Sequence, residues 1–298
     1  MPTIFALGPQ GTFSARLAEK LLATHVSGTS NYLSVNGDAL TCEFTRTIPE
    51  IFHKVESDPD SFGAVPIENN SAGPVGQTMD SLENSDVRVI GEIREKIRFA
   101  LLAFGNMEGI RNLYIHPMAF NQCMNYISDT LKNARVVNSD SNMDSYNRFM
   151  GDFNEFSAAI VPEPWTEDNE VDKRCKIFKG VQDFEHNETR FLVISKNNSE
   201  KLDFTKQKSS IFIDTDADRP SLLYDILTVF HEKNINMSML HSRPSRKYPG
   251  SYTFFIDFLN QTPSDTKVNE DSVLDCISGL EKLRLPFRIL GSYDVITL

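Results

Sequence analysis

The 298-residue chain has few cysteines, one tryptophan and no hydrophobic run long enough to cross a bilayer. Its four cysteines, Cys42, Cys123, Cys175 and Cys276, lie far apart and form no CxxC pair or His/Cys cluster, which argues against a zinc site and a disulfide framework. The chain starts with strand-like residues from Thr3 rather than a basic run and an apolar segment, so we expect no secretory signal. These absences indicate a reduced, cytoplasmic, soluble protein without membrane contact.

Basic residues are also scarce, because 30 Lys and Arg face 41 Asp and Glu and leave a net charge of -11. A nucleic-acid-binding surface needs clustered positive charge, so the composition argues against a nucleic-acid partner. It does not argue against an anionic small molecule, since a binding site depends on local charge. The length predicts two domains, and 40% hydrophobic residues are enough for ordinary buried cores.

Strand-like and helical patterns alternate over about the first 197 residues. Such alternation predicts open, mostly parallel sheets, and a restart of the pattern after Gly105 predicts two α/β lobes with a cleft between them. Lobe 1 covers about residues 1–104 and 180–197, and lobe 2 about residues 105–179. The expected strands and extended segments are Thr3–Leu7, Phe62–Ile67, Val87–Phe104, Asn112–Ile115, Arg135–Asn138, Ala158–Val161 and Phe191–Ser195, and two of the expected helices are Ala119–Leu131 and Met143–Phe153.

The polar segment Asn197–Lys208 is interpreted as a linker. After it, strands and helices follow in the order βαββαβ, which is the ferredoxin-like motif. Pro220 suits the first turn of its first helix. The expected strands are Ile211–Asp214, Met237–His241, Tyr252–Phe258 and Phe287–Ile296, with a turn-rich segment over Pro244–Gly250.

Two loops, Gly8–Ser14 and Pro66–Gly73, each follow a predicted strand and lead into a helix. Free N–H groups and the positive dipole end make a helix start attractive to anions. For either loop alone, helix capping or turn formation without a ligand is the more common role. Ligands of open α/β sheets bind beyond the carboxyl ends of the strands, where both loops can meet. Neither loop has the lysine of a P-loop, which argues against a nucleotide.

Thr189 lies just before a predicted strand, flanked by Asn187 and Arg190. A threonine hydroxyl is a weak acid and needs a charged neighbour or an oriented donor to act. Taken singly, Arg190 is more often an ion-pair residue, His116 a hydrogen-bonded structural residue and Gln122 a solvated surface residue. The residues alone therefore predict a two-lobed α/β cleft for a carboxylate-bearing small molecule, and they leave the reaction open.

Four motifs follow one another along the chain: Gly8–Ser14, Pro66–Asn69 with Gly73, His116-Pro117 with Gln122-Cys123, and Asn187-x-Thr189-Arg190-Phe191. In this order they resemble the motifs of the prephenate dehydratase family. The C-terminal unit resembles an ACT domain, the amino-acid-sensing module of these enzymes. The resemblance spans nearly the whole chain. It implies a catalytic domain over residues 1–197 resembling the type II periplasmic-binding-protein fold, and an ACT domain over residues 208–298.

The resemblance also implies a carbon-oxygen lyase that converts prephenate to phenylpyruvate, the precursor of phenylalanine, with loss of carbon dioxide and the ring hydroxyl. Aromatisation drives the reaction, so no metal or organic cofactor is expected. By analogy Thr189 protonates or hydrogen-bonds the leaving hydroxyl, and Arg190 and Asn69 complete the catalytic group. The implied substrate-binding residues are Thr12, Phe13, Ser14, Ser71, Gln122 and Phe191.

The chain departs from the family pattern at three positions of the catalytic domain. Ile115 replaces a serine before His-Pro, Met118 replaces a glutamine after it, and Asn70 replaces Thr or Ser. These changes could shift preference toward arogenate, which carries an amine in place of the keto group. No chorismate mutase helix precedes Thr3, so we expect a monofunctional enzyme.

The two ligand motifs of the ACT unit depart further. Ser221, Leu222 and Leu223 replace glycine-alanine-leucine, and the second motif reads His241-Ser242-Arg243-Pro244 where the family has glutamate-serine-arginine-proline. Feedback by phenylalanine and a purely oligomerising ACT domain therefore stay open as equal alternatives. In either case the family resemblance implies a homodimer or homotetramer.

Two other functions are weighed against the lyase. A non-catalytic amino-acid or carboxylate sensor also fits two α/β lobes and an ACT unit, but it needs no Thr189 beside Arg190. A related decarboxylase that does not aromatise the ring lacks, in the family comparison, the threonine and the ACT unit that this chain has.

Overall fold

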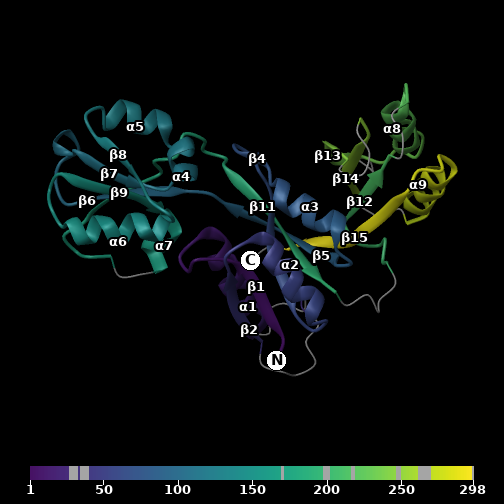
Figure 1. Ribbon diagram of the computed structural model, residues 1–298, viewed down its shortest axis with the longest axis horizontal. Helices are drawn as coiled ribbons and strands as arrows, with labels where there is room; N and C mark the ends of the chain where they lie inside the picture. The colour runs from purple at the N-terminus through teal and green to yellow at the C-terminus, as the bar shows by residue number, and fades with distance from the viewer. Residues whose placement is uncertain are drawn as a thin grey trace.

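The computed structural model describes residues 1–26, 33, 40–168, 171–196, 202–215, 219–245, 250–260 and 270–296. Two sheets organise these residues (Figure 1). The larger has the strand order β13-β14-β12-β15-β5-β11-β3-β1-β2, with β4 paired to β3, and the smaller has the order β10-β6-β9-β7-β8. Lobe 1 lies in the centre of Figure 1, lobe 2 at the left and the C-terminal unit at the right.

Lobe 1 forms one end of the large sheet and packs its helices against it. Leu17 and Leu21 of α1 lie in one buried cluster with Ile4 and Phe62, so the apolar side of this helix is fixed to the strands. Thr47 caps α2 by accepting a hydrogen bond from Glu50 N. The elements are β1 (Thr3–Leu7), α1 (Phe13–Val26), β2 (Thr41–Thr45), α2 (Ile48–Ser57), β3 (Phe62–Asn69), β4 (Gly73–Pro74), α3 (Gly76–Asn84), β5 (Arg88–Lys96) and β11 (Glu188–Ser195).

Lobe 2 is built on the five-stranded sheet. The long extended segment expected over Val87–Phe104 is two strands in different sheets, so β6 already belongs to this lobe. The single helix expected over Ala119–Leu131 is divided at Cys123. The elements are β6 (Phe99–Ala103), the 3-10 helix η1 (Met107–Gly109), β7 (Asn112–Ile115), α4 (Pro117–Gln122), α5 (Met124–Thr130), β8 (Arg135–Asn138), α6 (Asn142–Asp152), β9 (Ser157–Pro162), α7 (Glu163–Asp168) and β10 (Lys176–Lys179).

The C-terminal unit has the predicted order βαββαβ. Its helix α8 begins at Leu222, not at Pro220, because Ser221 adopts a left-handed conformation with φ of 67°. Residues 197–201 of the expected linker and 246–249 of the expected turn lie outside the described residues. The elements are β12 (Lys208–Asp214), α8 (Leu222–Glu232), β13 (Met237–Pro244), β14 (Tyr252–Leu259), α9 (Glu270–Lys282) and β15 (Phe287–Ile296).

The expectation of mostly parallel sheets is wrong. Parallel pairs occur between β1 and β2, β1 and β3, β7 and β8, β7 and β9, and β15 and β5, whereas the other described pairs are antiparallel. The physical reason is the path of the chain between lobes. Strand β11 returns from lobe 2 and enters the large sheet between β3 and β5, antiparallel to both. Among the described helices, none is long and apolar enough to span a membrane.

The C-terminal unit continues the sheet of lobe 1. Strand β15 pairs in parallel with β5, with Asp294 opposite Gly91 and Ile296 opposite Ile93, and Figure 1 shows β15 running from the C-terminal unit into the centre of the molecule. The backbones approach closely here: a Cβ on Gly291 would lie 2.0 Å from the carbonyl oxygen of Val89. Gly291 therefore permits the close contact between lobe 1 and the C-terminal unit.

Replacing Gly291 by alanine is expected to lower the free energy of unfolding by about 1–3 kcal/mol, because the added methyl group overpacks a backbone contact that cannot move aside. Urea unfolding followed by circular dichroism measures the change. Gly151→Ala is the matched control, since a Cβ at this α6 position meets no atom within 4 Å and is expected to have no destabilising effect. Equal midpoints for G291A and the unaltered protein would contradict the proposed contact.

Candidate active site

The strand that carries Thr189 is longer than the sequence predicts. Strand β11 begins at Glu188, so Thr189 and Arg190 lie within it and not before it. Successive side chains of a strand point to opposite faces. On one face Thr189 is opposite Asn69 of β3, and on the other Arg190 is opposite Glu68. The two residues that the sequence places side by side therefore have different surroundings.

Thr189 and Asn69 are joined by a hydrogen bond whose direction is fixed. Asn69 Oδ1 accepts from the backbone N–H groups of Ser71 and Ala72, at 3.0 and 2.9 Å, and from Ser71 Oγ at 2.8 Å. Backbone N–H groups can only donate, so the other end of the amide is Nδ2. This Nδ2 donates to Thr189 Oγ1 at 2.8 Å. The Thr189 oxygen is thus an acceptor here, and its own proton can be donated elsewhere.

Asn187 extends this group across the lobes. Its Oδ1 accepts from Asn69 Nδ2 at 3.0 Å, and its Nδ2 donates to Oε1 of Gln122, on α4 of lobe 2, at 2.6 Å. Gln122 is 7% exposed and Asn187 2% exposed. The solvated role considered for Gln122 in isolation is therefore wrong, because α4 turns this side chain inward at the lobe junction. The role of Asn187 was not predicted, although the motif Asn187-x-Thr189-Arg190-Phe191 contains this residue.

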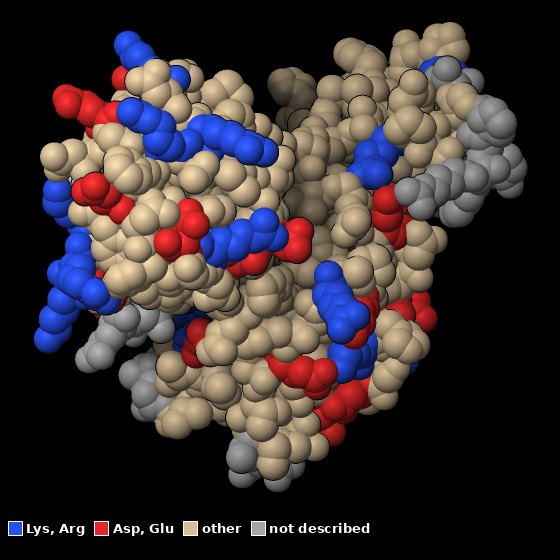
Figure 2. All heavy atoms as spheres, turned by 60° about the vertical axis from the view of Figure 1, so that its left-hand side comes forward, with Lys and Arg blue, Asp and Glu red and all other residues tan. Residues whose placement is uncertain are grey.

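The group of Asn69, Thr189, Asn187 and Gln122 lies where the lobes meet. All four side chains are buried and uncharged, and each is held by a directional hydrogen bond. Figure 2 shows a hollow between lobe 2 and the rest of the molecule, with acidic and basic side chains interspersed around it. Such an arrangement can present hydrogen-bond donors to an anion and a hydroxyl proton to a leaving group.

The loop Gly8–Ser14 mainly caps the N-terminus of helix α1. Thr12 Oγ1 donates to the Pro9 carbonyl at 2.9 Å and accepts from Ala15 N at 3.3 Å, which is a helix cap. Gly11 has φ of 84°, as the tight turn requires. Ser14 lies in the first turn of α1. Within the described residues, no hydrogen bond joins Thr12 or Ser14 to the Asn69–Thr189 pair.

Two aromatic residues predicted to bind substrate pack into cores. Phe13 contacts Phe99 edge-on, with ring centroids 5.5 Å apart, and so links the start of α1 to lobe 2. Phe191 is 2% exposed in the core of lobe 1. His116 caps α4, since its Nδ1 accepts from Met118 N at 3.3 Å, and burial lowers its pKa. The capping bond agrees with the interpretation of His116, taken singly, as a hydrogen-bonded structural residue.

Arg190 lies in a buried cluster of charges between lobe 1 and the C-terminal unit. Its guanidinium bonds Glu68 at 2.9 Å, Glu92 of β5 at 2.8 Å, and Asp257 of β14. Lys208 of β12 adds a second cation, 2.7 Å from Glu92 and 3.5 Å from Asp257. Arg190 is thus neutralised by carboxylates of lobe 1 and of the C-terminal unit, and its guanidinium is directed away from Thr189.

The charges in this cluster stabilise one another. Burial alone would raise the pKa of Glu92, but the hydrogen bond and charge of Arg190 and the ammonium group of Lys208 outweigh it and lower the pKa to about 2. Burial alone would lower the pKa of Arg190, and the Asp257 and Glu92 carboxylates raise it instead. Burial raises the pKa of Tyr293, whose hydroxyl lies 2.5 Å from Ser210 Oγ at the edge of the cluster. Glu92 and Arg190 therefore stay charged and Tyr293 stays protonated at neutral pH.

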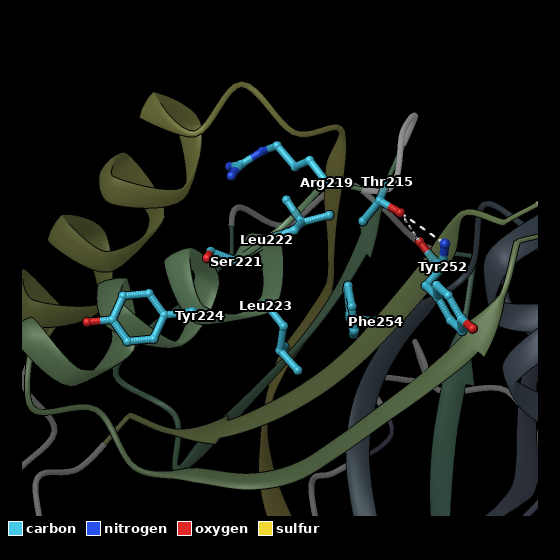
Figure 3. Close-up of a pocket in the computed structure, with 8 residues that line it drawn as sticks. All are labelled: Thr215, Arg219, Ser221, Leu222, Leu223, Tyr224, Tyr252 and Phe254. Carbon is cyan, nitrogen blue, oxygen red and sulfur yellow. Dashed lines mark hydrogen bonds between the residues drawn. The ribbon is translucent and has the colours of Figure 1, made fainter.

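The second predicted ligand motif of the C-terminal unit, His241 to Pro244, also faces lobe 1. His241 Nε2 lies 3.4 Å from Glu68 Oε1, and Arg243 pairs with Asp80 of α3 at 2.8 Å. A pocket of about 230 Å³ lies elsewhere in the C-terminal unit (Figure 3). The predicted Ser221, Leu222 and Leu223 line it, whereas His241 to Pro244 are not among its described lining residues, which also include Thr215, Arg219, Tyr224, Tyr252 and Phe254.

The described residues contain no group of three or more His, Cys, Asp or Glu side chains placed to hold a metal ion. The buried polar side chains of the group at the lobe junction are three amides and a hydroxyl, so the group itself carries no charge.

The chain matches proteins of one family over nearly its whole length. The sequence model described as prephenate dehydratase matches residues 4–199. A prephenate dehydratase from Methanocaldococcus jannaschii is 30% identical over 96% of this chain and 96% of its own length. The structure of prephenate dehydratase from Staphylococcus aureus has a TM-score of 0.76 at 28% identity and covers 98% of this chain and 100% of its own. The structure from Arthrobacter aurescens, in complex with L-Phe, has a TM-score of 0.74 at 26% identity, with coverages of 99% and 90%. The two-lobed catalytic fold and the matched sequence together show that the chain belongs to the prephenate dehydratase family.

Proposed function

We propose that the chain is a carbon-oxygen lyase that converts prephenate to phenylpyruvate, carbon dioxide and water in phenylalanine biosynthesis. The observation that carries the proposal is the hydrogen bond from Asn69 Nδ2 to Thr189 Oγ1, which leaves the Thr189 proton available to a substrate at the lobe junction. The family match supplies the substrate. The same proposal places the reaction in the cytoplasm, where four free thiols are stable.

In the proposed reaction, the bond between the ring and its carboxylate breaks and releases carbon dioxide. The electron pair moves through the ring and expels the hydroxyl on its far side. Thr189 Oγ1–H donates to this oxygen as the C–O bond lengthens, so that water leaves in place of hydroxide, and a solvent water then returns a proton to Thr189 Oγ1 and becomes hydroxide. Asn69 holds the threonine oxygen in position and stabilises negative charge developing on it. Aromatisation of the ring drives the step, and no group beyond the protein is needed.

The remaining site residues have proposed roles that follow their positions. Gln122 donates to a substrate carboxylate. Ser71, whose hydroxyl proton is bonded to Asn69 Oδ1, contributes to binding together with Thr12 and Ser14 at the start of α1. Phe13 and Phe191 hold α1 and β11 in place from the two cores. For Arg190 we propose a positioning role through β11, because its guanidinium is bound to three carboxylates on the opposite face.

Residues 1–197 form the proposed catalytic domain and 208–298 a proposed ACT domain that binds an amino acid. The pocket with Ser221, Leu222 and Leu223 supports this, as does the L-Phe complex of the Arthrobacter aurescens relative. Leu223, Tyr224 and Leu240 are exposed apolar residues of this unit. They fit a surface buried in a homodimer or homotetramer. For His241 and Arg243, the contacts with Glu68 and Asp80 support a role in the domain joint.

The purified protein is expected to form phenylpyruvate from prephenate at a rate typical of enzymes, about 1–10³ per second. Absorbance of phenylpyruvate in alkali measures the rate, and arogenate in place of prephenate tests the alternative substrate. Phenylalanine that slows turnover and raises the melting temperature would support the ACT proposal. Binding of prephenate without turnover of either substrate would contradict the lyase and favour a sensor.

A further inference from the structure

Each polar group of Asn187, in the backbone and in the side chain, has its own hydrogen-bond partners. Its backbone N–H donates to the Phe184 carbonyl at 3.3 Å, and its backbone carbonyl accepts from Ile97 N at 2.8 Å. Its Oδ1 accepts from Asn69 and, at 3.4 Å, from Ser71 Oγ, while its Nδ2 donates to Gln122. Asn187 is therefore a fixed bridge between β3 of lobe 1 and α4 of lobe 2.

The hydrogen bonds of Asn187 fix the orientation of the Gln122 amide. The backbone N–H groups of Ser71 and Ala72 require Asn69 Oδ1 to face them, so Nδ2 of Asn69 faces Asn187. Asn187 must then present Oδ1 to Asn69 and Nδ2 to Gln122. Gln122 accepts this bond with Oε1. The backbone N–H groups of Ser71 and Ala72 thus determine that Nε2, and not Oε1, of Gln122 is turned away from Asn187.

The free end of the Gln122 amide is a donor. Within the described chain, Nε2 of Gln122 has no protein acceptor, and the residue lies at the lobe junction. An NH₂ group without a protein acceptor suits a carboxylate, whereas a carbonyl oxygen in its place would repel one. Asparagine is the side chain that performs this task, because it both accepts and donates at a fixed distance. An aspartate accepts twice, and an alanine does neither.

We infer that Asn187 is a positioning residue that orients the Gln122 amide so that its NH₂ group, and not its carbonyl oxygen, faces a carboxylate of the substrate. The inference rests on the proposed function, in which that carboxylate belongs to prephenate. Asn187 itself does not touch the substrate. Its effect is on substrate binding through Gln122, and on the position of Asn69.

The decisive variant is Asn187→Asp, which keeps the size and the acceptor but removes the donor. The new carboxylate attracts the NH₂ group of Gln122, the amide reverses, and its oxygen faces the substrate. We expect KM for prephenate to rise about 10- to 100-fold at pH 8, the scale of one charge-assisted hydrogen bond lost. As the pH falls toward 5, protonation of the introduced carboxyl group restores a donor to Gln122, and KM should return toward that of the unaltered protein.

Asn187→Ala is the matched control. It breaks the same two bonds without a charge that reverses Gln122, so its KM relative to the unaltered protein should not depend on pH. The titratable groups of the adjoining segments, His116, Asp183, His186 and Glu188, are present in all three proteins and cancel in the comparison. A pH-independent effect of N187D, equal to that of N187A, would overturn the inference and leave Asn187 a structural residue.

Two measurements separate this inference from the proposed function. The unaltered protein must turn over prephenate, and failure there contradicts the function alone. Nitrogen-15 NMR of the side-chain amides then tests the orientation without turnover, because the Gln122 protons, assigned by their loss in Gln122→Glu, should move downfield in N187D and not in N187A. If N187D does not fold, Gln122→Glu replaces it: this variant still accepts from Asn187 but places a charge before the substrate, and an unchanged KM would overturn the inference.

Discussion

Thr189→Ala is expected to lower kcat for phenylpyruvate formation about 10²–10⁴-fold, the range associated with loss of a general acid. The alanine removes the proton donor and leaves the Asn69 NH₂ group without its acceptor at 2.8 Å. The substrate carboxylates keep their other proposed donors, so KM should change much less than kcat. Steady-state kinetics on the two proteins, with melting temperatures to verify folding, measure both effects.

Thr189→Ser and Thr189→Val separate the chemistry from packing. Serine keeps the hydroxyl and should retain most of the rate, whereas valine keeps the shape and should lose as much as alanine. The side chain is 9% exposed, so a cavity effect would affect alanine more than valine. A loss of kcat below about tenfold in T189V would remove Thr189 from the role of acid.

Most of the fold could be predicted because its signals are local. Apolar runs gave strands such as Thr3–Leu7 and Asn112–Ile115 with their observed bounds, and the βαββαβ order followed from spacing alone. The direction of the strands could not be predicted, because the return of β11 between β3 and β5 depends on how the lobes are joined. The short β2 was also missed, since it has no long apolar pattern. Helix α2 was missed although Ile48, Ile51 and Val55 follow helical spacing after the Thr47 cap.

The sequence motifs that form the site could be predicted, but the contacts between their side chains could not. Asn69 and Thr189 are 120 residues apart in sequence, and Asn187 and Gln122 are 65 apart. No local pattern shows that these amides touch. The start of β11 was placed too late because Thr189 and Arg190 interrupt the apolar run that identifies the strand. Had the strand been predicted to include both residues, the alternation of side chains would have placed Arg190 and Thr189 on opposite faces of the sheet.

The opposite face of β11 has an equally specific environment. Arg190 and Lys208 meet Glu92 and Asp257, and all four side chains are at most 8% exposed. Two cations and two carboxylates balance in the interior, drawn from strands β5, β11, β12 and β14. Removing one partner from such a cluster lowers the free energy of unfolding by far more than the intact cluster contributes to it, because the remaining charge stays buried without compensation.

Arg190→Met is therefore expected to lower the free energy of unfolding by about 3–5 kcal/mol at pH 7, the usual scale for breaking a buried ion pair. Methionine fills much of the volume, so the effect is mainly electrostatic. Urea unfolding at 25 °C measures it. Arg174→Met is the control: Arg174 pairs with Asp172 at 2.5 Å, but its side chain is 65% exposed, and the unfolding midpoint should hardly move.

The pH dependence of the loss distinguishes charge from packing. In the unaltered protein the pKa of Glu92 is lowered from 4.5 to about 2, so this carboxylate contributes stability above pH 4.5 that is lost as the pH falls toward 2. Without Arg190, burial is the main influence on Glu92, and its pKa should rise. Protonation then relieves the uncompensated charge, and the difference in unfolding free energy between the two proteins should shrink from pH 7 to pH 4. A difference that stays constant over this range would assign the loss to packing, and the cluster would then not be the electrostatic joint between the domains.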